Sequence, residues 1–118
     1  MARTVLIVDD HPSFRSSARA LLAAEGFEVV GEAEDGASAI AATKRLHPEV
    51  VLLDVQLPDM DGFAVAGRIA GRNGGGPAIV LTSSRDAADF GSLVERCGAV
   101  AFVPKGELSG AALRSVLR

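Results

Sequence analysis

The chain has 118 residues, of which 48% are hydrophobic, and a formal net charge of −3 at pH 7. This length predicts one domain, and the scattered Lys and Arg residues exclude the dense basic patch of a nucleic-acid-binding surface. The single Cys97 excludes an internal disulfide, and the N-terminal run MARTVLIV is too short for a signal peptide or a membrane span. We therefore expect a cytoplasmic domain that contacts neither nucleic acid nor membrane directly.

Strands and helices alternate through the first half of the chain. Pro12 suits the first turn of a helix, Gly26 suits the end of that helix, and Pro48 stops a second helix. The first and third strands are unbroken apolar runs, which are typical of strands buried on both faces. The predicted elements are a strand at 4–8, a helix at 12–24, a strand at 27–34, a helix at 36–47 and a strand at 49–54.

The second half of the chain repeats this pattern. Asp59 and Asp61 are placed to cap the third helix, and the glycine-rich stretch 71–77 reads as a flexible connection. This stretch follows a helix and precedes a strand, which is the wrong polarity for a phosphate-binding loop. The predicted elements are a helix at 63–71, a strand at 78–82, a helix at 87–96, a strand at 100–103 and a helix at 107–118.

Strict alternation of apolar strands and helices predicts an α/β fold with a doubly wound, five-stranded parallel sheet. In such sheets the functional crevice lies outside the carboxyl ends of the strands, so the residues just after each strand are the candidates for chemistry. Those residues are Asp9 and Asp10, Glu34 and Asp35, Asp54, Thr82 and Lys105.

A rim with three carboxylates needs a cation beyond Lys105, because like charges at short range repel strongly. Carboxylate and carbonyl oxygens, without a Cys or His grouping, favour a hard ion such as Mg²⁺. Mg²⁺ typically binds one or two carboxylates together with phosphate oxygens, so the sequence predicts a phosphate as the guest.

Four motifs lie in order after the expected strands: VLIVDDHPSFR, LLDVQLPDMDG, IVLTSS and AFVPKG. With these motifs the chain resembles, over essentially its whole length, the receiver domain of two-component response regulators. The stretch VPKGELSGAALRSVL resembles receivers that precede a LuxR-type helix-turn-helix output. The resemblance implies a (βα)5 flavodoxin-like fold with strand order 2-1-3-4-5, and a single receiver domain over residues 1–118 with any output domain outside this chain.

The resemblance also implies the chemistry of the site. Asp54 would be the phospho-acceptor, taking a phosphoryl group from the phospho-His of a histidine kinase or a phosphotransfer protein. Asp10 would bind Mg²⁺ together with Asp54 and the backbone carbonyl of Gln56, and Asp9 would help through a metal-bound water. Lys105 would neutralise charge on the transferring oxygens.

A switch would follow from the new charge. Thr82 would donate to a phosphoryl oxygen, which would pull the loop after the fourth strand inward, and Phe102 would turn into the space that this loop leaves. The face of the fourth helix, fifth strand and fifth helix would be the surface that an output recognises to control transcription. Gln56 and Ser84 occupy positions that tune phosphate lifetime in the family. The chain departs from the family pattern at the lysine, because Pro104 precedes Lys105 where the family often has a proline after it.

Plainer roles stand beside these. Asp54 could be a helix cap, Thr82 a strand-end residue, Lys105 a solvated charge and Phe102 an ordinary core residue. His11 lies beside the acids, yet a polar histidine in a loop is usually solvated.

Two other function classes remain open. One is a Mg²⁺-dependent phosphatase that turns over an external substrate with Asp54 as nucleophile, although no lid or second general base is evident. The other is a receiver-shaped interaction domain that signals without phosphate. We expect a phospho-acceptor signalling domain rather than an enzyme, and the first or fifth helix could present a homodimer face on activation.

Overall fold

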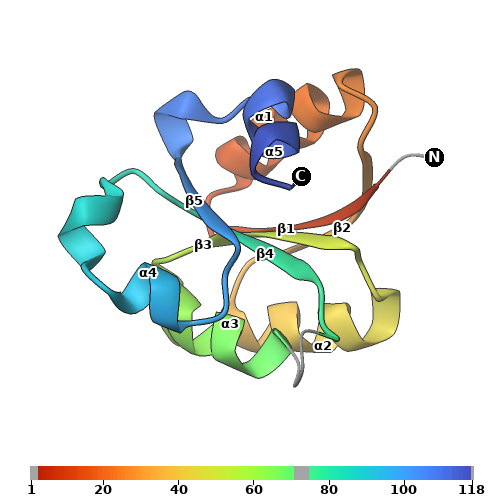
Figure 1. The fold of residues 1–118 in the computed structure, drawn as a ribbon. Helices are drawn as coiled ribbons and strands as arrows, with labels where there is room; N and C mark the ends of the chain where they lie inside the picture. Colours follow the sequence, from red (N-terminus) through yellow and green to blue (C-terminus); the bar gives the residue numbers. More distant parts are fainter. Residues whose placement is uncertain (1–2, 71–74, 118) are drawn as a thin grey trace.

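Five parallel strands form one sheet, in the order β2-β1-β3-β4-β5 that the resemblance implied. In this computed structural model, which describes residues 3–70 and 75–117, helices cover both faces of the sheet (Figure 1). From β1 the chain first adds β2 on one side and then returns to add β3, β4 and β5 on the other side. A functional crevice is expected between β1 and β3, outside the carboxyl ends of the strands. The strands are β1 (Thr4–Val8), β2 (Glu28–Ala33), β3 (Val50–Asp54), β4 (Ala78–Ser83) and β5 (Ala101–Pro104).

The helices divide into two layers (Figure 1). Helices α1 and α5 cover one face, where Leu22 and Leu113 are completely buried, and α2, α3 and α4 cover the other, where Ala39 and Val65 are completely buried. The helices are α1 (Pro12–Ala24), α2 (Gly36–Leu46), α3 (Gly62–Ile69), α4 (Leu93–Arg96) and α5 (Gly110–Val116), with 3-10 turns η2 (Ala87–Phe90) and η3 (Lys105–Glu107).

The central strands are apolar on both faces because both faces are covered. Along β1, Val5 and Ile7 pack in the α1–α5 layer, and Leu6 and Val8 pack in the α2–α3–α4 layer. Successive side chains of a strand point to opposite faces, so a strand buried on both sides reads as an unbroken apolar run. The prediction that the apolar run at 4–8 is a strand buried on both faces is confirmed.

Side-chain caps mark the starts of α2 and α5. Asp35 accepts a hydrogen bond from the Ser38 N–H (2.8 Å) at the start of α2. Ser109 accepts from the Ala112 N–H (2.9 Å), so α5 begins at Gly110 and not at residue 107 as predicted. Such caps satisfy backbone N–H groups that have no partner inside the helix.

The prediction of one continuous helix at 87–96 is wrong. Ala87–Phe90 form a 3-10 turn, Gly91 takes a positive φ of 58°, and only Leu93–Arg96 form an α-helical turn. A residue in this left-handed region interrupts the α-helix, and glycine adopts it readily. The break leaves the segment between β4 and α4 as an irregular cover over the sheet.

Some predictions fall outside the described residues. These are the end of the third helix at Gly71, residues 71–74 of the glycine-rich connection, and the final Arg118. Within residues 3–70 and 75–117, no helix is both long enough and apolar enough to cross a membrane.

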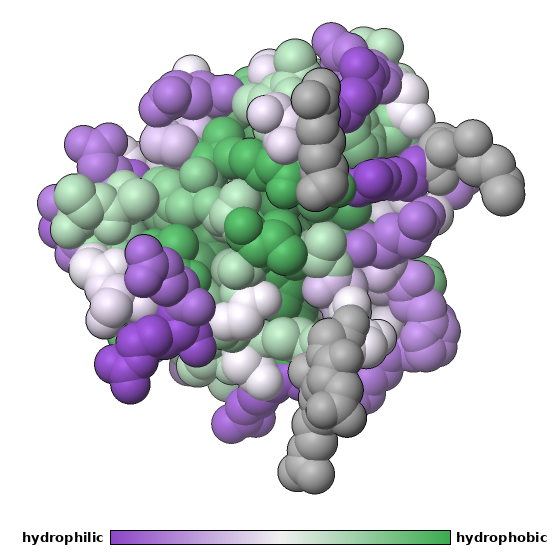
Figure 2. Space-filling view, in the orientation of Figure 1, coloured by the Kyte–Doolittle hydropathy of each residue, from purple (hydrophilic) through white to green (hydrophobic). Residues whose placement is uncertain are grey.

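The surface is mixed in character. Figure 2 shows apolar residues gathered across the middle of the face on which β5 lies between α4 and α5, with hydrophilic residues around them. Leu93 and Val100 are large apolar residues on this part of the chain that are 48% and 55% exposed. This is the face of α4, β5 and α5 that was expected from the sequence to be read out.

Candidate functional site

The carboxyl ends of the strands bring the predicted polar groups together. Asp54 is the last residue of β3 and is 3% exposed, and the β3–β4 register pairs it directly with Thr82. Asp9 follows β1 and is completely buried, and its backbone N–H donates to the Ala33 carbonyl (3.0 Å). Two buried carboxylates are costly unless they are paired or bound to a cation, so the site needs positive charge.

Lys105 supplies part of that charge. Its Nζ lies 2.6 Å from Asp9 Oδ2 and 3.5 Å from Asp54 Oδ2, and 4.4 Å from the centre of the Phe14 ring on α1. The contact with Asp9 is an ion pair rather than an aligned hydrogen bond. Lys105 begins η3 directly after Pro104. The departure from the family pattern at Pro104 therefore does not move the ammonium away from the acids.

One ammonium does not offset both acids. Burial, and after it the charge of Asp9, raises the pKa of Asp54 to about 6, against the lowering effects of Lys105 and of the Gln56 backbone N–H. The Gln56 N–H donates to Asp54 Oδ1 at 3.3 Å. The ionised carboxylate is thus under-compensated at neutral pH, which favours an additional cation at this position.

The donor set fits a divalent metal ion. Asp9, Asp10, His11 and Asp54 each offer a ligand atom, and these atoms all lie within 4.8 Å of one another. Carboxylate oxygens are the donors that Mg²⁺ prefers, and the excess of negative charge at Asp54 points the same way. The residues present therefore fit the predicted Mg²⁺, with Asp10 half-open to solvent at the mouth of the site.

Thr82 carries a second sign that the site accepts a guest. Its hydroxyl is completely buried, and Oγ1 has no hydrogen-bond partner among the described residues. Leaving such a group unpaired costs about 1–3 kcal/mol. Because paired residues of neighbouring strands point to the same side of a sheet, the hydroxyl lies on the same side as the Asp54 carboxylate. An anionic guest with acceptor oxygens would satisfy it.

The loop after β3 is closed tightly against the acceptor. The Gly62 N–H donates to the Val55 carbonyl (2.6 Å), and a Cβ at Gly62 would lie 2.4 Å from the Asp54 carbonyl oxygen. Only glycine allows this approach, which explains the residue at this place. Asp61 caps α3 by accepting from the Ala64 N–H at 2.8 Å, as predicted.

The predicted role of Asp59 as a second cap for α3 is wrong. Its carboxylate accepts from the Gly36 and Ala37 N–H groups at 2.7 and 3.0 Å, so it caps α2 from another loop. These two hydrogen bonds lower the pKa of Asp59. The contact joins the β3–α3 loop to the start of α2 beside the site.

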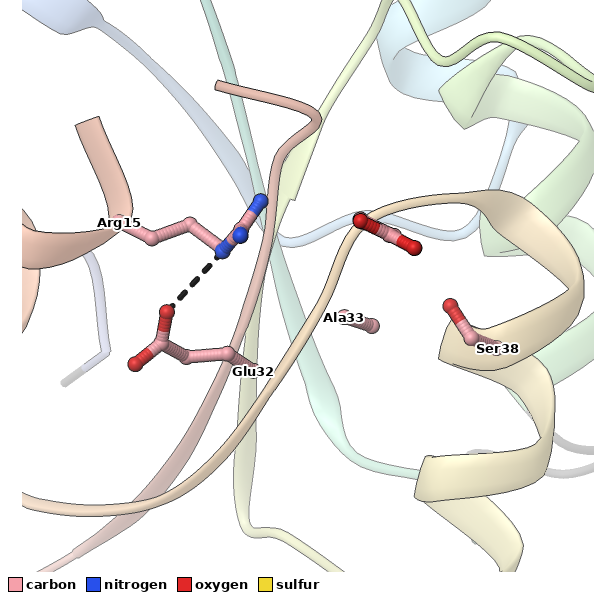
Figure 3. Close-up of a pocket in the computed structure, with 5 residues that line it drawn as sticks. Arg15, Glu32, Ala33 and Ser38 are labelled. Carbon is pink, nitrogen blue, oxygen red and sulfur yellow. Dashed lines mark hydrogen bonds and ion pairs between the residues drawn. The ribbon is translucent and has the colours of Figure 1, made fainter. Parts of the chain in front are cut away.

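Arg15 supports the site from the other side. Figure 3 shows its guanidinium beside Glu32 at an open pocket of about 300 Å³, with Ala33 and Ser38 on the far wall. Arg15 Nη1 donates to the Asp9 carbonyl at 2.5 Å, and its Nε donates to Glu32 Oε1 at 3.0 Å. Glu32 thereby orients a side chain that holds the loop carrying the acidic pair.

The side chains of three other predicted residues lie around the site rather than in it. Phe102 contacts Phe90 of η2, with ring centres 5.8 Å apart, and Phe90 in turn contacts Phe63 at 5.5 Å. Ser84 is exposed after β4, and the side chain of Gln56 is exposed after β3. Phe102 is thus packed in an aromatic row and paired in register with Leu81, one residue before Thr82.

Sequence reasoning missed three neighbours of the acidic pair. His11, Phe14 and Arg15 contact Asp9, Asp10 or Lys105, although the sequence analysis gave none of them a role at the site. All three belong to the motif VLIVDDHPSFR, so their closeness to the acids in the chain was the available signal. Only the turn into α1 decides that their side chains reach the site.

Comparison with known proteins agrees with this geometry. The family that matches is the response regulator receiver domain, over residues 5–117. The DNA-binding response regulator MtrA of Mycolicibacterium smegmatis is 38% identical over 91 residues, which are 75% of this chain and 38% of that protein.

Solved structures are also similar. A LuxR-family two-component response regulator from Aurantimonas sp. SI85-9A1 has a TM-score of 0.85 at 27% identity, covering 98% of this chain and 81% of that one. CheY in a CheX–CheY–BeF3–Mg complex from Borrelia burgdorferi has a TM-score of 0.84 at 25% identity, covering 98% and 86%. The chain spans about half, or less, of the length of the curated relatives. By the match over nearly its whole length, the chain belongs to the response regulator receiver domain family of two-component signalling.

Proposed function

We propose that Asp54 accepts a phosphoryl group from the phospho-His of a histidine kinase or a phosphotransfer protein. The observation that carries the proposal is the meeting of a buried, under-compensated carboxylate with an ammonium 3.5 Å away and an unpartnered hydroxyl on the neighbouring strand. These are the groups that a phosphoryl group needs around it: a nucleophile, a positive charge and a hydrogen-bond donor.

The transfer is a single displacement at phosphorus. An Asp54 carboxylate oxygen forms the new P–O bond while the P–N bond to the donor imidazole breaks, and the imidazole nitrogen leaves with the bonding electron pair and takes up a proton. Asp9, Asp10 and Asp54 would hold Mg²⁺, with the Gln56 carbonyl as a further ligand. When bound, that ion supplies charge neutralisation on the phosphoryl oxygens. Lys105 stabilises the same charge from the β5 side.

The phosphoryl group then acts on Thr82, whose hydroxyl has no partner among the described residues, and on Lys105, which is paired with Asp9. Thr82 donates its hydroxyl hydrogen to a phosphoryl oxygen, and Lys105 moves its ion pair from Asp9 toward the new anion. A charge-assisted hydrogen bond contributes about 1.5–3 kcal/mol, enough to change a two-state population severalfold or more. Phe102, packed on Phe90, is the side chain through which β5 and the α4 region respond. Gln56 and Ser84 flank the phosphoryl group and tune its lifetime.

The readout is the face of α4, β5 and α5, which presents exposed apolar residues. The proposal includes a transcriptional output of the LuxR helix-turn-helix type, attached to or paired with this domain, and the likeness to a LuxR-family response regulator supports it. It also includes homodimerisation on activation, which the exposed apolar residues of that face support. The domain acts in the cytoplasm as a phospho-acceptor that takes part in its own phosphorylation and dephosphorylation, without turnover of an external substrate. The gathering of the acids, the Lys105 ammonium and the Thr82 hydroxyl at one edge of the sheet supports that role.

The test is intact-mass spectrometry after incubation with acetyl phosphate, with and without Mg²⁺. We expect the gain of one phosphoryl group by the wild type, dependent on Mg²⁺, lost in mild alkali and absent from Asp54→Asn. Asp61→Asn, which keeps a cap oxygen at a neighbouring acid, is the matched control and should still be phosphorylated. Steady hydrolysis of a phosphomonoester would favour a phosphatase, and no gain despite Mg²⁺ binding would favour signalling without phosphate.

A further inference from the structure

The geometry points to His11 as a nitrogen ligand of the acidic site, which makes that site prefer transition-metal dications such as Ni²⁺ to Mg²⁺. The inference rests on the metal site of the proposed function and deepens it. Family resemblance gave the three acids a metal-binding role and gave His11 none.

The position of the imidazole is the first argument. His11 Nδ1 lies 3.0 Å from Oδ1 of Asp9 and 3.0 Å from Oδ1 of Asp10. In a six-coordinate site with bonds of about 2.1 Å, neighbouring ligand atoms are about 3.0 Å apart, and opposite ones about 4.2 Å. Both spacings fit a group whose ligand atoms, Asp54 included, all lie within 4.8 Å. One ion can therefore contact all of these groups with little movement of the side chains.

The backbone holds the imidazole there. The His11 N–H donates to Asp9 Oδ1 (2.8 Å), and Pro12 at the first turn of α1 keeps the preceding residue extended, with φ −98° and ψ 110°. The side chain makes no capping hydrogen bond to α1. Since its ring is 65% exposed, the nitrogen is open to an entering ion while its direction toward the acids is fixed.

A hydrogen bond accounts for only half of this arrangement. His11 Nδ1 is within hydrogen-bond distance of Asp9 Oδ1 (3.0 Å), but the same nitrogen lies equally close to Asp10 Oδ1, and one N–H donates well to only one of the two carboxylates. The buried, unpartnered Thr82 hydroxyl beside Asp54 is an independent sign that this crevice is built around a guest.

The chemistry of the donors decides which ion gains. Mg²⁺ favours oxygen ligands and keeps several waters, so an imidazole adds little to its affinity. Imidazole suits Ni²⁺, Cu²⁺ and Zn²⁺, and affinity for N/O sites rises along the series from Mn²⁺ to Cu²⁺. Because both kinds of ion use the same carboxylates, they exclude each other. Ni²⁺ is therefore a competitor of Mg²⁺ at this site.

The experiment is isothermal titration of the unphosphorylated protein with Ni²⁺ alone and with Mg²⁺ alone. We expect His11→Ala to weaken Ni²⁺ binding by at least about tenfold and to change Mg²⁺ binding less than about twofold. The matched control is His47→Asn, which removes the other histidine of the chain. His47 is exposed at the C-cap of α2 with φ 48°, a conformation that asparagine tolerates. This control should leave both affinities unchanged, and Asp10→Asn should weaken both.

Unchanged Ni²⁺ affinity in His11→Ala would overturn the inference, and so would an equal loss for both metals, which would mark a structural role only. If the wild type binds neither Ni²⁺ nor Mg²⁺, the inference and the proposed metal site both fail. If the Ni²⁺ result is as expected but acetyl phosphate adds no phosphoryl group, the inference holds and the proposed phospho-acceptor role fails.

Discussion

Replacing Asp54 by asparagine should stabilise the metal-free domain at neutral pH. The raised pKa of Asp54, from 3.8 to about 6, means that its ionised form is less stable in the fold than in the unfolded chain. At about 1.4 kcal/mol per pKa unit, this difference amounts to about 3 kcal/mol as an upper limit. Relaxation and water entry reduce it, so we expect a gain of about 1–2 kcal/mol, or about 4–8 °C in Tm for a domain of this size.

The gain should depend on pH with a defined sign. Between pH 3.8 and about 6, the folded state binds more protons than the unfolded state, so the stability of the wild type falls as pH rises through this window. Below pH 3.8 the carboxyl is protonated in both states and the penalty vanishes. The advantage of Asp54→Asn should therefore be small near pH 4 and complete above pH 7.

Far-UV circular dichroism in EDTA measures this, because the chain has no Trp or Tyr for a fluorescence assay. The charge-matched control is Glu95→Gln, at an exposed position of α4, which should shift Tm little at any pH. Added Mg²⁺ should raise the Tm of the wild type more than that of Asp54→Asn, because the variant lacks a ligand. Equal Tm values in EDTA above pH 7, or an advantage of the same size at pH 4, would refute the reasoning.

Three further variants test the frame around the acceptor. Asp59→Ala should lower stability at neutral pH, since it removes two hydrogen bonds to the start of α2. The loss of stability relative to the wild type should shrink as pH falls through the lowered pKa of the Asp59 carboxyl, and thermal melts over a pH series would measure it. Gly62→Ala should cost about 1–3 kcal/mol in urea unfolding because its Cβ would meet the Asp54 carbonyl oxygen, whereas Gly67→Ala, with open space around it, should be neutral or stabilising. Lys105→Ala should still be phosphorylated by acetyl phosphate, but the amide NMR shifts of β5 and α4 should no longer change on phosphorylation. Shift changes as large as those of the wild type would argue against Lys105 as the residue that links phosphorylation of Asp54 to β5 and α4.

Local patterns in the sequence determined most of the fold. Unbroken apolar runs identified the strands, and prolines, glycines and capping residues identified the ends of α1 and α2, because these signals act within a few residues of chain. Strict alternation then restricted the topology to a parallel, doubly wound sheet. For the same reason Asp9, Asp54, Thr82 and Lys105 could be predicted to meet, since parallel strands end at one edge.

Contacts between distant segments were decided only by the tertiary structure. Asp59 caps a helix 22 residues and more away along the chain, and Gly91 breaks the helix that the repeating pattern of strands and helices predicted at 87–96. The ion pairs of Lys105 with Asp9 and Asp54 join β5 to β1 and β3. The raised pKa of Asp54 depends on the depth of its burial beside Asp9. The type of each element and its apolar faces follow from periodicity, which the sequence carries, and the strand order was implied by the family resemblance. Distances and charge compensation follow from packing across the sheet, which no local pattern encodes.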